Sequence, residues 1–244
     1  MNAHDSWASF YDFVYEKSFG DFYGRLTGIN LETICKILPK GRVLDFGAGT
    51  GRLSVPLAEA GYAVTAIEAS DGMVKELKRK AAEVEISIHH CRIDEFHHAK
   101  GDLAIAMFTV MSYLTTEEAL ASSARAIFLS LDEGGLLFFD LPDIFLFSSG
   151  AHSPMRSSDF QRTIRINPTA EADVYTYHEK CSGVFEGRNF EYEDRFPIRY
   201  WDPDRVDAVL REQGFIPVRR FMPGFKSTGS SYHLYKKATS GGNS

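Results

Sequence analysis

Residues 43–51 read VLDFGAGTG, a short apolar run that contains an acid and is followed by three glycines on alternate positions. The first four residues are typical of a buried parallel strand, and the apolar-periodic segment after residue 51 predicts a helix. Gly47, Gly49 and Gly51 permit positive φ and let a ligand approach the bare backbone. The helix would point its free N–H groups at that ligand. The stretch therefore predicts a strand, a turn and a helix that bind a nucleotide-type ligand.

The spacing of the glycines separates two families that use such a turn. The dinucleotide fingerprint G-x-G-x-x-G would need glycine at position 52, where this chain has Arg52. The pattern instead resembles the first motif of the class I S-adenosylmethionine-dependent methyltransferases, in which the acid lies on the strand and the loop follows. The resemblance implies S-adenosylmethionine as the cofactor. The residues that it assigns to the cofactor in this stretch are Asp45, Gly47, Ala48, Gly49, Gly51 and Arg52.

Composition and charge narrow the classes of function. The 244 residues are 44% hydrophobic and 25% charged, which is ordinary globular composition. The net charge of −6 argues against a general nucleic-acid binder, which needs a basic surface. Three scattered cysteines indicate a reducing compartment, and no cluster of ligand residues has metal spacing. Since we find no signal pattern and no apolar stretch of ~18 residues, we expect a cytoplasmic protein that does not span a membrane.

The order of the elements indicates an α/β fold. Strands and helices alternate up to residue 141, a two-sided strand pattern fills 142–201, and a helix and two strands follow. By the resemblance, this order implies a doubly wound, seven-stranded Rossmann-like methyltransferase sheet with an inserted antiparallel β subdomain. We expect a single domain over 1–244. Its parts would be a helical lid at 1–40, the core at 41–141 and 202–237, and the insertion at 142–201, on the acceptor side.

Turn and capping residues set the expected boundaries. Ser70 and Asp202-Pro203 each predict the start of a helix. Thr115 and Glu118 have the spacing of a capping box, and Gly134-Gly135 would end the helix that follows. After the first strand, we expect core strands at 62–68, 84–88, 102–108 and 136–141, insertion strands near 160–166, 173–181 and 184–196, and a closing hairpin of 215–221 with 231–236.

Further positions match the methyltransferase family after the second and third strands. Glu68 ends the second strand, where an acid can accept both ribose hydroxyls, although nicotinamide enzymes use an acid in the same way. Ala69 and Met73 match the family's adenine pocket, and Met73 could equally be a core residue. Ile93, Asp94 and Glu95 follow the third strand, and the resemblance implies that Asp94 holds the adenine amino group. A capping or surface acid is the competing interpretation of Asp94.

The segment 108–114, FTVMSYL, follows the fourth strand and would lie beside the transferable methyl group. It contains Phe108, which the resemblance assigns to the cofactor, and Tyr113, a candidate catalytic residue. Enzymes that methylate DNA amines or glutamine amides resemble one another in an Asn/Asp-Pro-Pro-aromatic sequence here, and cytosine C5 enzymes carry a Pro-Cys pair. This chain has neither. We therefore expect a small-molecule acceptor.

The N-terminal aromatics favour a subgroup of the family. Tyr11, Tyr15 and Tyr23 lie in segments similar to the lid helices of small-molecule N-methyltransferases, in particular the enzymes that dimethylate amino sugars. The resemblance implies that a tyrosine here reaches the methionine end of the cofactor, and core packing is the alternative. It also implies that the insertion walls the acceptor pocket and can pair two subunits as a homodimer. Nitrogen is thus the favoured target atom.

The implied reaction is an in-line displacement, in which alignment and exclusion of water do most of the work. A neutral amine needs only its lone pair, whereas a hydroxyl would need a base. His178 on a predicted insertion strand is the candidate base, with His152, Glu179 and His233 as other possibilities. Three other functions stay open: methylation of oxygen or carbon in a small metabolite, NAD(P)-dependent oxidation or reduction, and cofactor binding without catalysis.

Overall fold

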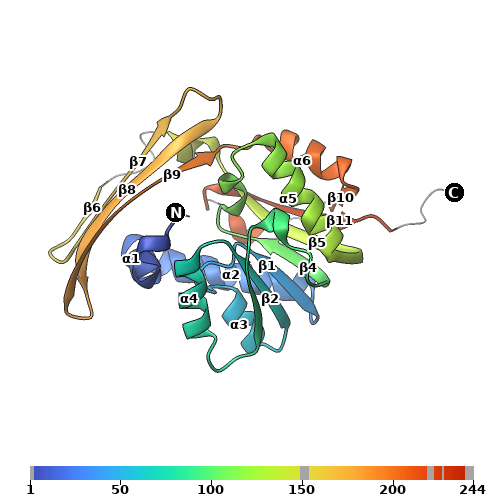
Figure 1. Ribbon diagram of the computed structural model, residues 1–244, viewed down its shortest axis with the longest axis horizontal. Helices are drawn as coiled ribbons and strands as arrows, with labels where there is room; N and C mark the ends of the chain where they lie inside the picture. Colours follow the sequence, from blue (N-terminus) through green and yellow to red (C-terminus); the bar gives the residue numbers. More distant parts are fainter. Residues whose placement is uncertain (1–2, 149–153, 219–222, 227, 240–244) are drawn as a thin grey trace.

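The computed structural model describes residues 3–148, 154–218, 223–226 and 228–239 and contains two sheets (Figure 1). The larger sheet has the strand order β10-β11-β5-β4-β1-β2-β3, in which β11 runs antiparallel to both of its neighbours. This confirms the expected Rossmann-like sheet with its closing hairpin. Its strands are β1 (Arg42–Phe46), β2 (Ala63–Glu68), β3 (Ile86–His90), β4 (Gly101–Ala106), β5 (Leu131–Pro142), β10 (Phe215–Pro217) and β11 (Ser230–Lys237).

Helices cover both faces of this sheet. One face packs against α2 and α3 through Leu26, Ile34 and Leu57, and the other packs against α5 and α6. The helices are α1 (Tyr11–Phe19), α2 (Asp21–Ile37), α3 (Ser54–Glu59), α4 (Asp71–Lys80), α5 (Glu117–Ser130) and α6 (Pro203–Glu212). Short segments of 3-10 helix form η1 (Asp5–Phe10), η2 (Ile93–Glu95), η3 (Val110–Tyr113), η4 (Ile144–Phe147) and η5 (Pro223–Phe225).

The helix caps agree with the sequence except around α5. Ser70 accepts the Met73 N–H, and Asp202 caps α6, as expected. The residue that caps α5 is Thr116 rather than Thr115, because its hydroxyl accepts the Ala119 N–H at 3.1 Å. The helix ends at Ser130, before the Gly134-Gly135 pair. These glycines lie within β5, where the pairing with β4 shifts register, so their backbone freedom serves a bulge and not a helix end.

The insertion forms a separate antiparallel sheet, as expected. Its strands, in the spatial order β6-β7-β8-β9, are β6 (Met155–Arg156), β7 (Phe160–Pro168), β8 (Val174–Phe185) and β9 (Arg188–Arg199). Figure 1 shows this curved sheet to one side of the larger sheet, with α1 between them. Side chains alternate across it, so that Glu179 and Cys181 are buried on the inner face. The inner face is the one turned toward α1 and the larger sheet, so a ligand between the two sheets would contact this face.

The N-terminal segment fills the space between the two sheets. Trp7 is fully buried and stacks on Tyr192 of β9 at 4.3 Å between ring centroids. On its other side, η1 packs against α4 of the larger sheet. The segment thus joins the two sheets, and its assignment as a lid over 1–40, like the other domain boundaries, remains a prediction.

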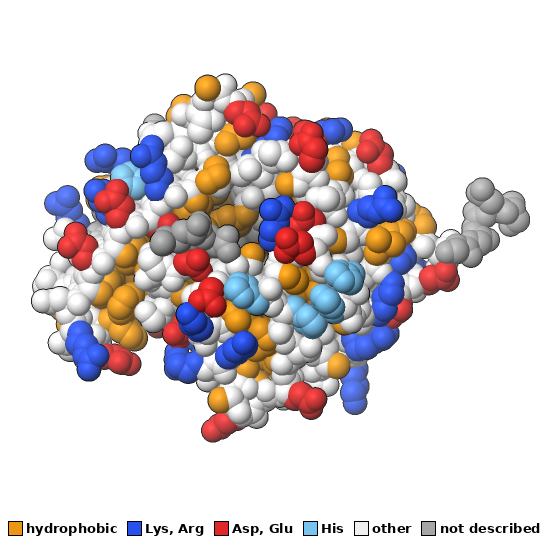
Figure 2. All heavy atoms as spheres, in the orientation of Figure 1, with side chains coloured by type: hydrophobic (Ala, Val, Ile, Leu, Met, Phe, Trp, Pro, Cys, Tyr) orange, Lys and Arg blue, Asp and Glu red, His pale blue; other side chains and the backbone are white. Residues whose placement is uncertain are grey.

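The surface is mixed in charge. Figure 2 shows basic and acidic side chains interspersed over one face, with histidines gathered on part of it. Across the described ranges, no helix has the length and apolar character needed to cross a membrane.

Candidate active site

Acidic residues lie near the carboxyl ends of three strands of the larger sheet, the adjacent β1 and β2 and, beyond β4, β5. Asp45 on β1, Glu68 on β2 and Asp140 on β5 occupy the edge where α/β sheets bind their ligands. Asp45 is 3% exposed, and the Ser54 hydroxyl donates to its Oδ2 at 2.6 Å. Burial raises the pKa of Asp45 to about 6, against the opposing effect of that hydrogen bond. The ionised form of Asp45 is therefore unfavourable in the folded protein, and packing alone does not explain an acid at this position.

The three glycines of the turn differ in the space around the position of a Cβ atom. All three have positive φ, at +71° for Gly47, +57° for Gly49 and +88° for Gly51. A Cβ on Gly47 would lie 2.6 Å from Val110, and one on Gly51 would lie 2.4 Å from Leu77. A Cβ on Gly49 would meet no atom within 4 Å. Gly47 and Gly51 thus permit close packing, while Gly49 faces open space in which a ligand can reach its backbone.

The Glu68 carboxylate keeps free hydrogen-bond acceptor positions. Its carboxylate accepts N–H groups from Gly49 and Ser70, each at 2.8 Å and each through a different oxygen. A carboxylate has about four acceptor positions, so two stay available for the paired hydroxyls of a ribose. These residues therefore fit a nucleoside. Next to Glu68, Met73 is buried in α4, and the Ala69 carbonyl is 3.1 Å from His90 Nε2.

The acids after β3 form the turn η2. The Arg92 guanidinium donates to both carboxylate oxygens of Asp94, at 3.0 and 2.9 Å, and the Arg92 N–H donates to Glu95. Ile93 packs against the core. An adenine amino group would therefore share the Asp94 carboxylate with Arg92, and the role expected for Asp94 remains a prediction.

Asp140 fixes the loop after β4, and sequence reasoning missed it. Its Oδ1 accepts the N–H groups of Phe108 at 2.5 Å and Thr109 at 3.1 Å. Both of these residues have left-handed backbone, at φ +69° and +66°, which costs about 1–2 kcal/mol each outside glycine. Strain of this kind persists where the surroundings impose it, and it often marks a functional site. An acid at the end of a buried strand, as in Asp45 and Glu68, was the signal that could have identified Asp140.

The predicted aromatic residues form one contiguous group. Tyr15 lies 4.4 Å from Tyr11 and 5.5 Å from Tyr23, measured between ring centroids, and Tyr23 lies 5.8 Å from Phe108. The Arg52 guanidinium sits 4.8 Å above the Phe108 ring and donates to the Thr27 hydroxyl. The Tyr23 hydroxyl is buried without a hydrogen-bond partner. Arg52 and Tyr23 are thus placed to receive a polar group of a ligand.

A cavity of about 280 Å³ opens beside this group. The N-terminal helices, the loop after β4, η4, β11 and the inner face of the insertion enclose it. Most of its lining is aromatic or aliphatic, which is the usual character of a small-molecule site. Tyr15, Tyr23 and Phe108 contribute to the lining, whereas Tyr11 contacts Tyr15 from behind.

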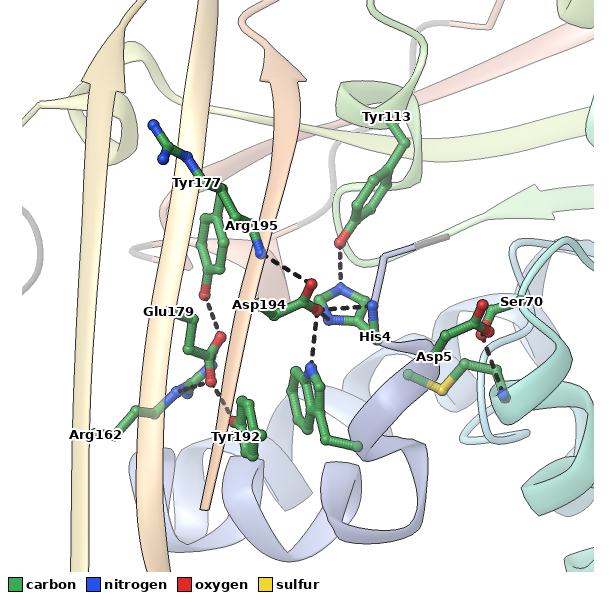
Figure 3. A network of polar contacts seen from close by, with 12 residues as sticks. His4, Asp5, Ser70, Tyr113, Arg162, Tyr177, Glu179, Tyr192, Asp194 and Arg195 are labelled. Carbon is green, nitrogen blue, oxygen red and sulfur yellow. Dashed lines mark hydrogen bonds and ion pairs between the residues drawn. The ribbon is translucent and has the colours of Figure 1, made fainter. Parts of the chain in front are cut away.

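A buried polar network underlies the wall that the insertion contributes (Figure 3). Arg162 on β7 is 1% exposed and donates twice to the fully buried Glu179 on β8, at 2.8 and 3.1 Å. The hydroxyls of Tyr177 and Tyr192 also donate to Glu179. Tyr177 and Arg162 line the cavity. Glu179 is thus fully occupied as an acceptor, which leaves it unsuited to act as a free base.

His178, the candidate base on the insertion, does not line the cavity. Its neighbours Tyr177 and Glu179 point inward, so the alternation of the strand turns His178 to the outer face. There its Nε2 lies 2.7 Å from Glu193. His233 on β11 contacts Ser231 and stacks on Phe139, and it does not line the cavity. His152 lies outside the described residues.

Tyr113 does line the cavity, and it contacts a residue that the sequence did not single out. The Tyr113 hydroxyl lies 2.8 Å from Nε2 of His4, which in turn lies against Asp194 of β9 (Figure 3). Nearby, Asp5 accepts the Ser70 hydroxyl and the Gly72 N–H, which fastens η1 to the start of α4. His4 and Asp194 are 190 positions apart. No local pattern could therefore have connected them.

Comparisons with known proteins agree with this architecture. A family model described as "Methyltransferase domain" matches residues 43–135. "Putative methyltransferase YqeM" of Bacillus subtilis (strain 168) is 30% identical over 208 residues, which cover 82% of this chain and 84% of that protein. A second relative, from Geobacillus, is 32% identical over 103 residues, which span only 42% of its length.

Two solved structures share the whole fold. An S-adenosylmethionine-dependent methyltransferase from Clostridium acetobutylicum ATCC 824 superposes with a TM-score of 0.80 at 16% identity, over 94% of this chain and 98% of that one. CalS10 of Micromonospora echinaspora, described as an amino pentose methyltransferase with S-adenosylmethionine bound, has a TM-score of 0.74 at 17% identity. That match covers 93% and 96% of the two chains.

Proposed function

The chain belongs to the S-adenosylmethionine-dependent methyltransferases, and on that premise we propose that it methylates a small, uncharged acceptor, with nitrogen as the favoured target atom. The cavity of about 280 Å³ carries this proposal. It lies beside the edge of the larger sheet that holds Asp45, Glu68 and Asp140, which we call the cofactor edge. It is large enough for a ring-sized group and lies between the loop after β4 and the insertion. Its walls would exclude water and hold the acceptor in line with the donor.

The charges around the cavity indicate what enters it. Among the described residues that line it, Arg162 is the one Lys or Arg, and Glu179 already neutralises it. Asp140 is buried and committed to backbone N–H groups, and burial raises its pKa. An anionic group would meet no free cation in this part of the wall. We therefore expect the portion of the acceptor inside the cavity to be neutral and largely apolar.

The residues at the cofactor edge divide the work of binding. We expect Glu68 to accept the ribose hydroxyls, and the open space at Gly49 to let the methionine end approach the backbone of the turn. Arg52 is placed to pair with a carboxylate. S-adenosylmethionine supplies an electrophilic methyl group on a positively charged sulfur, so the protein needs to align the reactants more than to activate them.

Nitrogen is favoured because the fold extends over the full length of an amino pentose methyltransferase, including the insertion. The Tyr177 oxygen can accept a hydrogen bond from an N–H or O–H group of the acceptor while its own proton is donated to Glu179. We also infer that the insertion can pair two subunits, which sedimentation at several protein concentrations would test.

Paired probes of equal shape test the acceptor class. Release of S-adenosylhomocysteine would be measured with 4-methylaniline and 4-methylphenol, and with 3-methylaniline and 3-methylphenol. We expect turnover with at least one amine, at a rate above that of its oxygen counterpart, and a product that carries one added methyl group. Glu68→Gln, which weakens cofactor binding, is the control. If the rate with every probe equals the rate without one, the small-molecule proposal fails.

A further inference from the structure

The His4 ring forms part of the cavity wall and connects two groups from distant parts of the chain. It is 8% exposed, with Nε2 at 2.8 Å from the Tyr113 hydroxyl and Nδ1 at 3.5 Å from Asp194 Oδ2 (Figure 3). Asp194 Oδ2 also accepts the His4 backbone N–H at 2.8 Å and the Trp7 indole N–H at 2.9 Å. Both His4 and Tyr113 line the cavity. The Asp194 carboxylate, the His4 imidazole and the Tyr113 hydroxyl thus lie in that order, and the Tyr113 side chain lines the proposed acceptor site.

The backbone at His4 is strained. Its φ of +67° lies in the left-handed region, which costs about 1–2 kcal/mol for a residue other than glycine. The hydrogen bond from its N–H to Asp194 holds this conformation. Nδ1 has no hydrogen-bond partner within good geometry, although it is buried beside a carboxylate. Strain and an unsatisfied buried polar atom at one residue point to a functional role.

The neighbours of His4 decide where its proton lies. Burial would raise the pKa of Asp194, but hydrogen bonds from His4 and Trp7 outweigh it and hold that pKa below its usual range. Asp194 is therefore ionised, and the imidazole nitrogen that faces it should carry the proton. Nε2 is then unprotonated and accepts the Tyr113 O–H, because a tyrosine is ordinarily neutral at pH 7. The lone pairs of the Tyr113 oxygen remain free for the acceptor.

We propose that His4, supported by Asp194, removes the acceptor's proton through the hydroxyl of Tyr113. This inference rests on the proposed function. The acceptor's N–H or O–H bond breaks, its proton passes to the Tyr113 oxygen, and the Tyr113 proton passes to His4 Nε2. The acceptor's lone pair forms the bond to the methyl carbon, and the carbon–sulfur bond breaks with its electrons left on sulfur. The positive charge lost from sulfur is balanced by the imidazolium, which Asp194 stabilises until water takes the proton.

Other groups near His4 do not supply a competing base. Among the described residues, the titratable side chains that contact His4 from other elements are Asp194 on β9, Tyr113 in η3 and Tyr11 in α1. Its chain neighbour Asp5 turns its carboxylate to Ser70. The remaining ring contacts are Trp7 and Phe196. His4 is therefore the proton acceptor with access to Tyr113.

Nitrogen NMR of the labelled imidazoles, with S-adenosylhomocysteine as the added probe, tests the arrangement without any turnover. We expect His4 to be protonated at Nδ1 and unprotonated at Nε2. His178 is the matched control, because its Nε2 faces Glu193 at 2.7 Å and should carry the proton instead. A His4 imidazole protonated at Nε2 would donate to Tyr113 rather than accept from it, and this result would overturn the relay.

Kinetics with 4-methylphenol test the role itself. His4→Gly suits the left-handed backbone and leaves space for free imidazole. We expect kcat to fall at least about a hundredfold and added imidazole to restore it in proportion to its unprotonated form. His178→Gln should behave as the wild type. A His4→Gly rate within threefold of the wild type would refute the proposal.

Two further comparisons keep the outcomes distinct. If His4→Gly no longer binds S-adenosylhomocysteine, Asp194→Asn provides the decision, because loss of the charge that stabilises the imidazolium should lower kcat at least about tenfold. If the wild type methylates no probe, the proposed function fails, and the NMR result alone then decides whether Tyr113 donates its proton to His4. If the wild type is active and the variants match it, only the relay falls.

Discussion

The cofactor edge and the acceptor cavity are built in opposite ways. At the cofactor edge, contacts join residues close in sequence, with Ser54 and Asp45 nine positions apart and Gly49 and Glu68 nineteen apart. Around the cavity, Asp194 binds a residue 190 positions away, and Arg162 binds Ser18 across 144. The first site is encoded in short stretches of chain and persists wherever the fold forms. The second exists only when the N-terminus, the insertion and the sheet meet.

The N-terminal segment connects the two sites. Asp5 fastens it beside Glu68 through Ser70 and Gly72, while His4 and Trp7 fasten it to Asp194 in the insertion. Asp12 adds a third attachment, to the Thr50 hydroxyl of the glycine turn and to Lys80. A segment attached on both sides should transmit cofactor binding to the acceptor wall.

The largest effect that we expect concerns the insertion. Arg162→Met would leave Glu179 buried without its cation, and loss of one partner from a buried pair costs about 3–5 kcal/mol of unfolding free energy. Urea denaturation would measure this loss. The double variant Arg162→Met with Glu179→Gln should recover part of it. If the single variant is as stable as the wild type, the buried pair does not support the acceptor wall.

A smaller effect with a defined pH dependence is expected at the cofactor edge. The pKa of Asp45 rises from 3.8 to about 6 on folding, so its stabilising contribution is complete below pH 3.8 and is lost as pH rises through 6. Asp45→Asn should therefore gain roughly 3 kcal/mol relative to the wild type between pH 4 and pH 8. Cofactor binding should weaken at the same time.

The opposite sign is expected for Asp102→Asn. The hydrogen bond from Arg42 lowers the pKa of Asp102, so the wild-type carboxylate stabilises the fold above its unfolded pKa and loses this effect in acid. The variant should lose stability at pH 8 and little at pH 3. If the unfolding free energies of Asp45→Asn and Asp102→Asn depend on pH in the same way, the opposite effects assigned to the two carboxylates are wrong.

A still smaller effect is expected where the N-terminal segment packs against α4. A Cβ on Gly72 would lie 2.4 Å from the Asp5 carbonyl oxygen, so Gly72→Ala should detach η1 from α4. We expect faster hydrogen exchange near residues 4–15 with a loss of about 1–2 kcal/mol. Gly28→Ala is the matched control, because a Cβ there would meet no atom within 4 Å. Unchanged exchange in Gly72→Ala would show that the two attachments are independent.

The contrast between the sites explains what the sequence could predict. The strand, turn and helix at residues 43–59, the acid at Glu68 and the inserted sheet all follow from local patterns, and the structure contains them. The side of the sheet that His178 faces depends on strand register, which the pattern of the insertion did not fix. The contacts of His4 and Asp194 depend on the packing of distant segments. Asp140 could have been inferred, since it repeats the strand-end acid of β1 and β2.

Calorimetric titration with S-adenosylhomocysteine, carried out in parallel on Glu68→Gln and Tyr177→Phe, tests the division between the two sites most directly. Glu68 supplies the free acceptor positions of the cofactor edge, while Tyr177 belongs to the acceptor wall. The account predicts that Glu68→Gln weakens binding at least about tenfold, which is about 1.4 kcal/mol, and that Tyr177→Phe stays within twofold of the wild type. Equal affinities in the two variants, or a larger loss in Tyr177→Phe, would contradict it.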